Sequence, residues 1–133
     1  MFSLISASFD RELAAGVEAP GVARGLLTEW FSSVRTDGTL GTARLLVSEL
    51  VTNAVCHGRG RVALKARLFD RRLLVEVLDE GAGFEPDLCE RRVRPPGAGR
   101  WGLSIVDSEA SRWGIGRDRS YVWFELDRPR ASA

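Results

Sequence analysis

Apolar residues recur at helical spacing in three stretches of the chain, and this pattern predicts three amphipathic helices. The first runs from Pro20 to near Ser33, the second from near Thr42 to Gly58, and the third begins at Leu103. In each stretch the apolar positions repeat every three or four residues, so they share one face of a helix. Proline at a first helical position and glycine just past a last one are typical of helix ends. We therefore expect three helices that each present one apolar face to a core.

Alternating apolar and polar residues predict strands elsewhere in the chain. The clearest alternation covers 62–68 and 73–79, and the turn at 70–72 between them predicts a hairpin. Weaker alternation predicts further strands, the first of them at a sheet edge, at 3–9, 113–116 and 121–126. Two segments without alternation are expected to be a turn and a polar tail, at 10–19 and 127–133.

The second strand of the hairpin ends on an acid. Successive side chains of a strand point to opposite faces, so Asp79 shares a face with the apolar Leu73 and Val77. An acid at the end of an apolar face lies near the core, where an ionised carboxylate accepts hydrogen bonds and needs donors. The exocyclic amine of adenine would be a suitable donor.

The helix expected at 42–58 carries Glu49, Asn53 and His57 at intervals of four. This spacing keeps a carboxylate, an amide and an imidazole on one flank. A solvated polar stripe on a surface helix is the plain alternative, and the helix alone does not exclude it. Asn53 offers an uncharged oxygen to a hard cation such as Mg²⁺. We expect His57, beside a glycine helix end, to be structural.

Two glycine-rich stretches flank a segment with three prolines and three arginines. Gly81 and Gly83 follow Asp79, and the second stretch, 97–102 (GAGRWG), opens the helix at Leu103. A glycine loop at a helix start offers N–H groups and the positive end of the helix dipole to a phosphate. The second stretch lacks the G-K-[ST] ending of a P-loop and follows no strand of a parallel βαβ unit. We therefore expect a phosphate site of another type.

Composition indicates one domain over residues 1–133. The chain has 133 residues, of which 44% are hydrophobic and 28% charged, with a net charge of +1. This charge gives no general attraction to nucleic acid or membranes, and no stretch is apolar over the roughly 18 residues of a membrane span. Cys56 and Cys89 are too few for a disulfide framework and have no zinc-type spacing. The first residues lack a signal-peptide pattern, so we expect a reduced, cytoplasmic protein.

Three motifs, in order along the chain, resemble those of the GHKL (Bergerat-fold) ATPases and kinases, most closely the bacterial anti-sigma factor kinases. Residues 49–58 (ELVTNAVCHG) resemble the N box of that family, 79–84 (DEGAGF) its G1 box, and 99–106 (GRWGLSIV) its G2 box. Residues 111–115 and 122–126 resemble the closing strands of the anti-sigma branch. The resemblance runs from about residue 20 to 126, and the three motifs together are far more specific than any one of them.

The resemblance implies an α/β two-layer sandwich, with a mixed, mostly antiparallel sheet and helices on one face. ATP would lie between the helices, under a lid at 85–99. Asp79 would recognise the adenine amine, Asn53 would ligate Mg²⁺, and Glu49 would act as the general base. The other implied nucleotide contacts are Gly81, Gly83, Gly99, Arg100, Trp101, Gly102, Leu103 and Ser120.

The implied function is transfer of the ATP γ-phosphate to a serine or threonine of an anti-anti-sigma (STAS-type) antagonist, together with sequestration of a sigma factor. Such proteins are often homodimers. The alternatives are an ATP-binding module that acts by protein binding alone and a sensor histidine kinase domain. The latter is disfavoured because His57 is the only histidine. Two departures from the family bear on lid geometry and turnover. Trp101 is bulky, and the turn 117–120 lacks a Gly-Thr pair, which leaves Ser120 as its substitute.

Overall fold

A computed structural model describes residues 5–34, 38–81, 103–116 and 120–128 of the chain. In these ranges the elements are, in order, β1 (Ile5–Leu13), α1 (Ala19–Val34), α2 (Thr39–His57), β2 (Val62–Phe69), β3 (Arg72–Leu78), α4 (Leu103–Glu109), β4 (Arg112–Ile115) and β5 (Tyr121–Asp127). The three predicted helices, the central hairpin and the later strands are therefore confirmed, with end points shifted by one to three residues.

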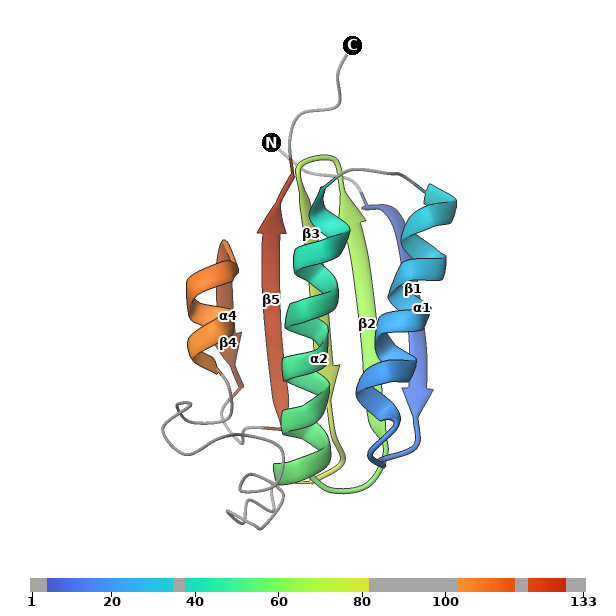
Figure 1. Cartoon of the computed structure of the whole chain (residues 1–133), viewed down its shortest axis with the longest axis vertical. Coiled ribbons are helices and arrows are strands. Elements are labelled where there is room, and N and C mark those ends of the chain that lie inside the picture. The colour runs from blue at the N-terminus through green and yellow to red at the C-terminus, as the bar shows by residue number, and fades with distance from the viewer. Residues whose placement is uncertain (1–4, 35–37, 82–102, 117–119, 129–133) are drawn as a thin grey trace.

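The described strands form one sheet in the order β1-β2-β3-β5-β4, and α1, α2 and α4 cover one face of it (Figure 1). This two-layer architecture confirms the predicted fold class. Every pairing between the described strands is antiparallel, although a mixed sheet was expected. For β3 and β5 the reason is local. Strand β5 begins beside the end of β3, where the backbone N–H of Asp79 donates to the carbonyl of Ser120 at 2.9 Å. The two strands must then run in opposite directions.

The core lies between the helices and the inner face of the sheet. Alternate residues of the central strands point into it, as the parity of the sequence predicts, and Leu64, Val75 and Phe124 are fully buried. The helices contribute the opposing side chains, among them Leu27, Phe31, Leu46 and Leu50. Burying each such side chain contributes about 1.5–3 kcal/mol. This shared core fixes the position of α2 over the sheet.

Strand β1 is longer than its sequence predicts. Residues 10–13 were expected to be part of a turn, but they continue the strand and pair with β2 as far as Leu13 opposite Val62. The charged residues Asp10 and Glu12 lie on the outer face of the sheet and are exposed, whereas Leu13 is buried. An edge strand tolerates such charges because one of its faces meets solvent. The prediction of a turn at 10–13 was therefore wrong.

Helix α2 also starts earlier than predicted, at Thr39 instead of near Thr42. Gly41 lies in its first turn and does not interrupt it, because Thr39 is buried and Leu40 packs against the core. Tertiary packing here outweighs the poor helix propensity of glycine. The predicted stop at Gly58 is confirmed, and Gly58 N–H donates to the carbonyl of Ala54 at 3.0 Å.

The expected polar tail begins with two ordered residues. Asp127 is the last residue of β5, and Arg128 is only 6% exposed. Its guanidinium Nη1 donates to the carbonyl of Phe69 at 2.7 Å, so it holds the turn between β2 and β3. The tail prediction was wrong at these two positions, while 129–133 lie outside the described residues.

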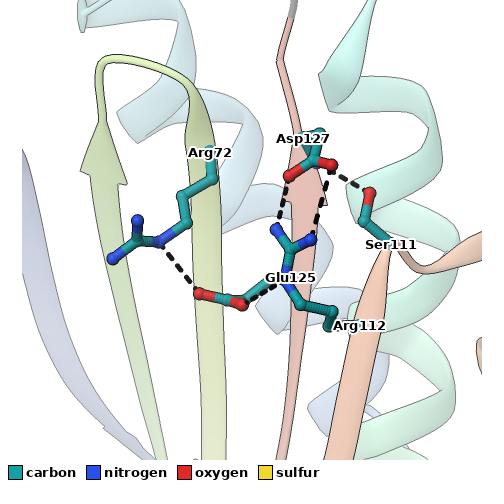
Figure 2. Close-up of polar contacts among 5 residues, drawn as sticks. All are labelled: Arg72, Ser111, Arg112, Glu125 and Asp127. Atoms are coloured by element: carbon teal, nitrogen blue, oxygen red, sulfur yellow. Dashed lines mark hydrogen bonds and ion pairs between the residues drawn. The ribbon is translucent and has the colours of Figure 1, made fainter. Parts of the chain in front are cut away.

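The outer face of the sheet carries a network of charged side chains instead of a second helical layer within the described residues. Glu125 lies between two arginines, 2.9 Å from Arg72 Nε and 2.7 Å from Arg112 Nε (Figure 2). Arg112 also bonds to Asp127, whose backbone N–H donates to Ser111 Oγ at 2.8 Å. Among the described ranges, none of the helices has both the length and the hydropathy needed to cross a bilayer.

Candidate functional site

The polar flank of α2 is largely turned away from solvent. Asn53 is 7% exposed and His57 is 9% exposed, while Glu49 is half-buried. A solvated surface stripe would leave all three side chains in water, so that interpretation does not fit Asn53 and His57. The C-terminal half of α2 therefore carries a buried amide, with a more accessible carboxylate one turn earlier.

Asp79 follows β3 directly and is half-buried, as expected for a residue on the same face of the strand as Leu73 and Val77. Its Oδ1 accepts hydrogen bonds from the backbone N–H groups of Gly81, at 2.9 Å, and Arg59, at 3.4 Å. Backbone donors stabilise the ionised form of a carboxylate. The acid predicted at the end of the apolar face is thus fixed by the two loops around it.

The Asp79 carboxylate lies against the C-terminal end of α2. A Cβ atom added at Gly58 would stand 2.3 Å from Asp79 Oδ2 and 2.6 Å from the carbonyl of Ala54. The backbone of Gly58 is extended, with φ −92° and ψ −167°, which any residue can adopt. Glycine is needed here for space, since a side chain would collide with the carboxylate.

Three element ends meet at this end of the molecule. The end of α2, the end of β3 and the start of β5 lie together at the lower end of Figure 1, while α4 begins higher up, beside β4. Asp79 and Gly81 follow β3, Ser120 precedes β5 and accepts the N–H of Asp79, and Asn53 lies on α2 near Gly58, which adjoins the Asp79 carboxylate. Glu49 lies further back along α2, and the half-buried Leu103 is the first residue of α4. The remaining predicted residues, Gly83, Gly99, Arg100, Trp101 and Gly102, lie outside the described residues.

Two arginines bridge α1 and α2 next to Glu49. Arg24 Nη1 donates to Ser48 Oγ at 2.8 Å, and Arg44 donates to the hydroxyl of Thr28. The sequence analysis did not single out these residues. Their signal was weak, because an arginine on a helix is usually a solvated charge.

The loop after α2 was also missed as a part of the site. Arg59 and Arg61 donate backbone N–H groups to the carboxylates of Asp79 and Glu80, respectively. The sequence showed this segment as a simple Gly-Arg-Gly turn. Only an acidic pair at the end of the neighbouring strand, Asp79-Glu80, hinted that the turn had acceptors within reach.

Comparison with known proteins finds a matching family and a partial relative. The family model described as "Histidine kinase-, DNA gyrase B-, and HSP90-like ATPase" matches residues 39–130. An anti-sigma F factor of Clostridium acetobutylicum is 48% identical over 46 residues, which are 32% of this chain and 32% of that protein. The match to the family model covers well over half of the chain.

The fold has a counterpart among solved structures. The crystal structure of the RsbU and RsbW domains of Rv1364c from Mycobacterium tuberculosis is similar with a TM-score of 0.66 and 22% identity. That likeness covers 96% of this chain and 35% of the other, so the chain spans about a third of the length of both relatives. The predicted resemblance is confirmed, and the chain belongs to the histidine kinase-, DNA gyrase B- and HSP90-like ATPase family.

Proposed function

We propose that this protein is an ATP-binding regulator of the anti-sigma factor kinase type. It transfers the γ-phosphate of ATP to a serine or threonine of a STAS-type antagonist, and it sequesters a sigma factor. The observation that carries the proposal is the fixed carboxylate of Asp79 against the end of α2, the helix that also carries the buried Asn53, in a chain of an ATPase family. The similarity to an anti-sigma F factor supports the choice of partners. Such partners would place the protein in the cytoplasm, and it would act as a homodimer.

The described residues fit a magnesium nucleotide. Asn53 is a buried amide on α2, and its side-chain oxygen suits a hard cation that takes oxygen ligands. Asp79 is an acceptor at a strand end, and it would bind the exocyclic amine of adenine. The bound nucleotide would supply the phosphoryl group, and Mg²⁺ would neutralise charge on its phosphates.

Glu49 is the proposed general base. It lies on the same flank of α2 as Asn53 but is half-buried instead of buried, so a partner's hydroxyl group can approach it. A carboxylate within reach of a hydroxyl removes its proton as the phosphoryl group is transferred. In this proposal Asn53 binds the cation and Glu49 removes the proton.

The other proposed nucleotide contacts surround this pair. Gly81 follows Asp79, Ser120 bonds to Asp79 through its carbonyl, and Leu103 begins α4. The proposal also includes the predicted contacts outside the described residues: Gly83, Gly99, Arg100, Trp101 and Gly102. Substitutions at Gly81, Leu103 and Ser120 can thus be tested separately from substitutions at the contacts outside the described residues.

The direct test is phosphoryl transfer from γ-labelled ATP to purified candidate STAS antagonists in the presence of Mg²⁺. The wild-type protein should label one of them, and Glu49→Gln should slow labelling by about 100-fold or more while ATP still binds. Glu29→Gln, an exposed glutamate on α1, is the matched control and should behave as wild type. Equal labelling by wild type and Glu49→Gln would reject Glu49 as the base.

A non-catalytic ATP-binding module is the second candidate. The bulky Trp101 and the short turn at 117–120 favour it, because both depart from the family pattern around the lid. Tight ATP binding without labelling of any antagonist would support this candidate. Recovery of a sigma factor from the native cell in an ATP-dependent complex would then identify its partner.

A further inference from the structure

The loop after α2 and the segment after β3 are joined by reciprocal hydrogen bonds. Glu80 N–H donates to the carbonyl of Arg59 at 2.8 Å, and the Glu80 carboxylate accepts the backbone N–H of Arg61 at 2.9 Å. Glu80 therefore bonds to the α2–β2 loop on both sides of Gly60. Both bonds have ordinary geometry for N–H···O contacts.

Gly60 makes this contact possible. Its φ is +69°, a left-handed conformation that favours glycine, and a Cβ at this position would lie 1.8 Å from Glu80 Oε2. The carboxylate of Glu80 thus lies directly against the backbone of the loop. Any side chain at position 60 would displace it.

The same loop touches Asp79. Arg59 N–H donates to Asp79 Oδ1 at 3.4 Å, and Gly58 leaves space for Asp79 Oδ2. On the other side, the carbonyl of Ser120 accepts the N–H of Asp79. The position of the Asp79 carboxylate therefore depends on where the α2–β2 loop lies, and Glu80 fixes that loop.

We propose that Glu80 is a positioning residue for the nucleotide base: by binding the Arg59–Arg61 backbone, it holds the Asp79 carboxylate in the orientation that distinguishes adenine from guanine. The inference rests on the proposed role of Asp79. Adenine presents an amine where guanine presents a carbonyl oxygen, so a correctly placed carboxylate accepts from one and repels the other. A displaced carboxylate loses this discrimination.

Glu80 is well suited to a clean substitution. It is exposed, so shortening it leaves no core cavity. Glu12 is also exposed and lines the same surface pocket, but its described contact is an ion pair with the side chain of Arg61 at 3.5 Å. Glu12→Ala is therefore a matched control that removes a neighbouring carboxylate and leaves the loop backbone bonded.

The experiment measures the dissociation constants of ATP and GTP, with Mg²⁺, for the full chain. Glu80→Ala should lower the preference for ATP over GTP by about tenfold, whereas Glu80→Gln, which keeps an acceptor oxygen, and Glu12→Ala should retain it. A purely structural role of Glu80 would lower the unfolding temperature and leave the ratio of the two constants unchanged. An unchanged ratio in Glu80→Ala would overturn the proposal.

A second measurement needs no nucleotide. Amide hydrogen exchange followed by NMR should become at least about tenfold faster at Gly81 and Arg59 in Glu80→Ala, and stay near wild type in Glu80→Gln. Unchanged exchange at both amides would equally overturn the positioning role. Asp79→Asn tests the role of Asp79 separately from the role of Glu80. If that variant keeps the ATP preference, the role proposed for Asp79 fails, while the exchange rates still decide whether Glu80 positions its carboxylate.

Discussion

The two ends of the sheet are held together by different kinds of contact. At the end where α2 stops, the carboxylates of Asp79 and Glu80 accept backbone N–H groups from neighbouring loops. At the opposite end, arginine side chains make the contacts: Arg112 pairs with Glu125 and Asp127 (Figure 2), and Arg128 bonds to the β2–β3 turn. Asp79 and Glu80 at the first end thus accept from backbone N–H groups, whereas Glu125, Asp127 and the Phe69 carbonyl at the second end accept from arginine side chains.

This difference fits a role in nucleotide binding for the Asp79 end and a role in stability for the Arg128 end. Backbone donors are positioned by the fold and carry no full charge, so they hold a carboxylate without cancelling its negative charge. A carboxylate paired with arginine is instead neutralised and is a poorer acceptor for a ligand. We therefore expect substitutions at the Arg128 end to change stability and substitutions at the Asp79 end to change nucleotide binding.

The largest effect should come from Arg128→Ala at the opposite end. The side chain is buried, and its loss leaves the carbonyl of Phe69 without its donor, so the free energy of unfolding should fall by about 2–3 kcal/mol. Urea denaturation measures this, and ATP affinity of the folded protein should not change. Arg71→Ala removes an exposed cation of the same turn and should cost less than about 0.5 kcal/mol. Similar losses in the two variants would contradict the role assigned to Arg128.

Asp79→Asn should show the reverse pattern. The amide presents an N–H where the adenine amine needs an acceptor, so ATP affinity should fall about 30-fold, or about 2 kcal/mol. An amide oxygen can still accept the Gly81 N–H, so the unfolding free energy should change by less than about 1 kcal/mol. Calorimetric titration with ATP and urea denaturation measure the two quantities. A large loss of stability with unchanged affinity would break the comparison between the ends.

Tyr121 makes a side-chain contact near the Asp79 end, so it tests whether side-chain contacts there affect stability or nucleotide binding. Its hydroxyl donates to Glu76 Oε2 at 2.6 Å, so Tyr121→Phe should lower the unfolding free energy by about 1 kcal/mol at neutral pH without changing ATP affinity. A change in ATP affinity would show that side-chain contacts also shape this end.

The contribution of Tyr121 should also depend on pH. Burial and the hydrogen bond to Glu76 raise the pKa of Tyr121 from 10.0 to about 12. The folded state thus favours the protonated hydroxyl, whose stabilisation is complete below pH 10 and is lost as the pH rises toward about 12. The stability difference between wild type and Tyr121→Phe should shrink across this window. A difference that stays constant from pH 9 to about 12 would contradict the assignment.

The smallest effect is expected for Arg112→Gln. Asp127 and Glu125 raise the pKa of Arg112, which remains charged, but the side chain is 49% exposed and water screens its ion pairs. The loss should be about 0.5 kcal/mol or less, and it should shrink further in about 1 M salt. Thermal unfolding at low and high salt measures it. A loss comparable to that of Arg128→Ala would mean that exposed pairs stabilise this end as much as the buried arginine.

Much of the fold could be predicted because its signals are local. The four-residue spacing on α2 and the alternation along β2 and β3 each lie within one element, and parity alone placed Asp79 on the buried side of β3. The errors came where a neighbouring element decided the outcome. Residues 10–13 became a strand because β2 offered a partner, and Arg128 became buried because the β2–β3 turn offered carbonyl acceptors.

The sequence by itself determined the elements, their buried faces and the candidate residues Glu49, Asn53 and Asp79, since hydrophobic periodicity and motif spacing are properties of short stretches of chain. Tertiary structure alone decided that Gly58 makes room for the Asp79 carboxylate and that Glu80 bonds to the loop around Gly60. These contacts join residues about twenty positions apart, and neither partner carries a local pattern that names the other. The physical reason is that a backbone N–H becomes a specific donor only when the fold has placed it.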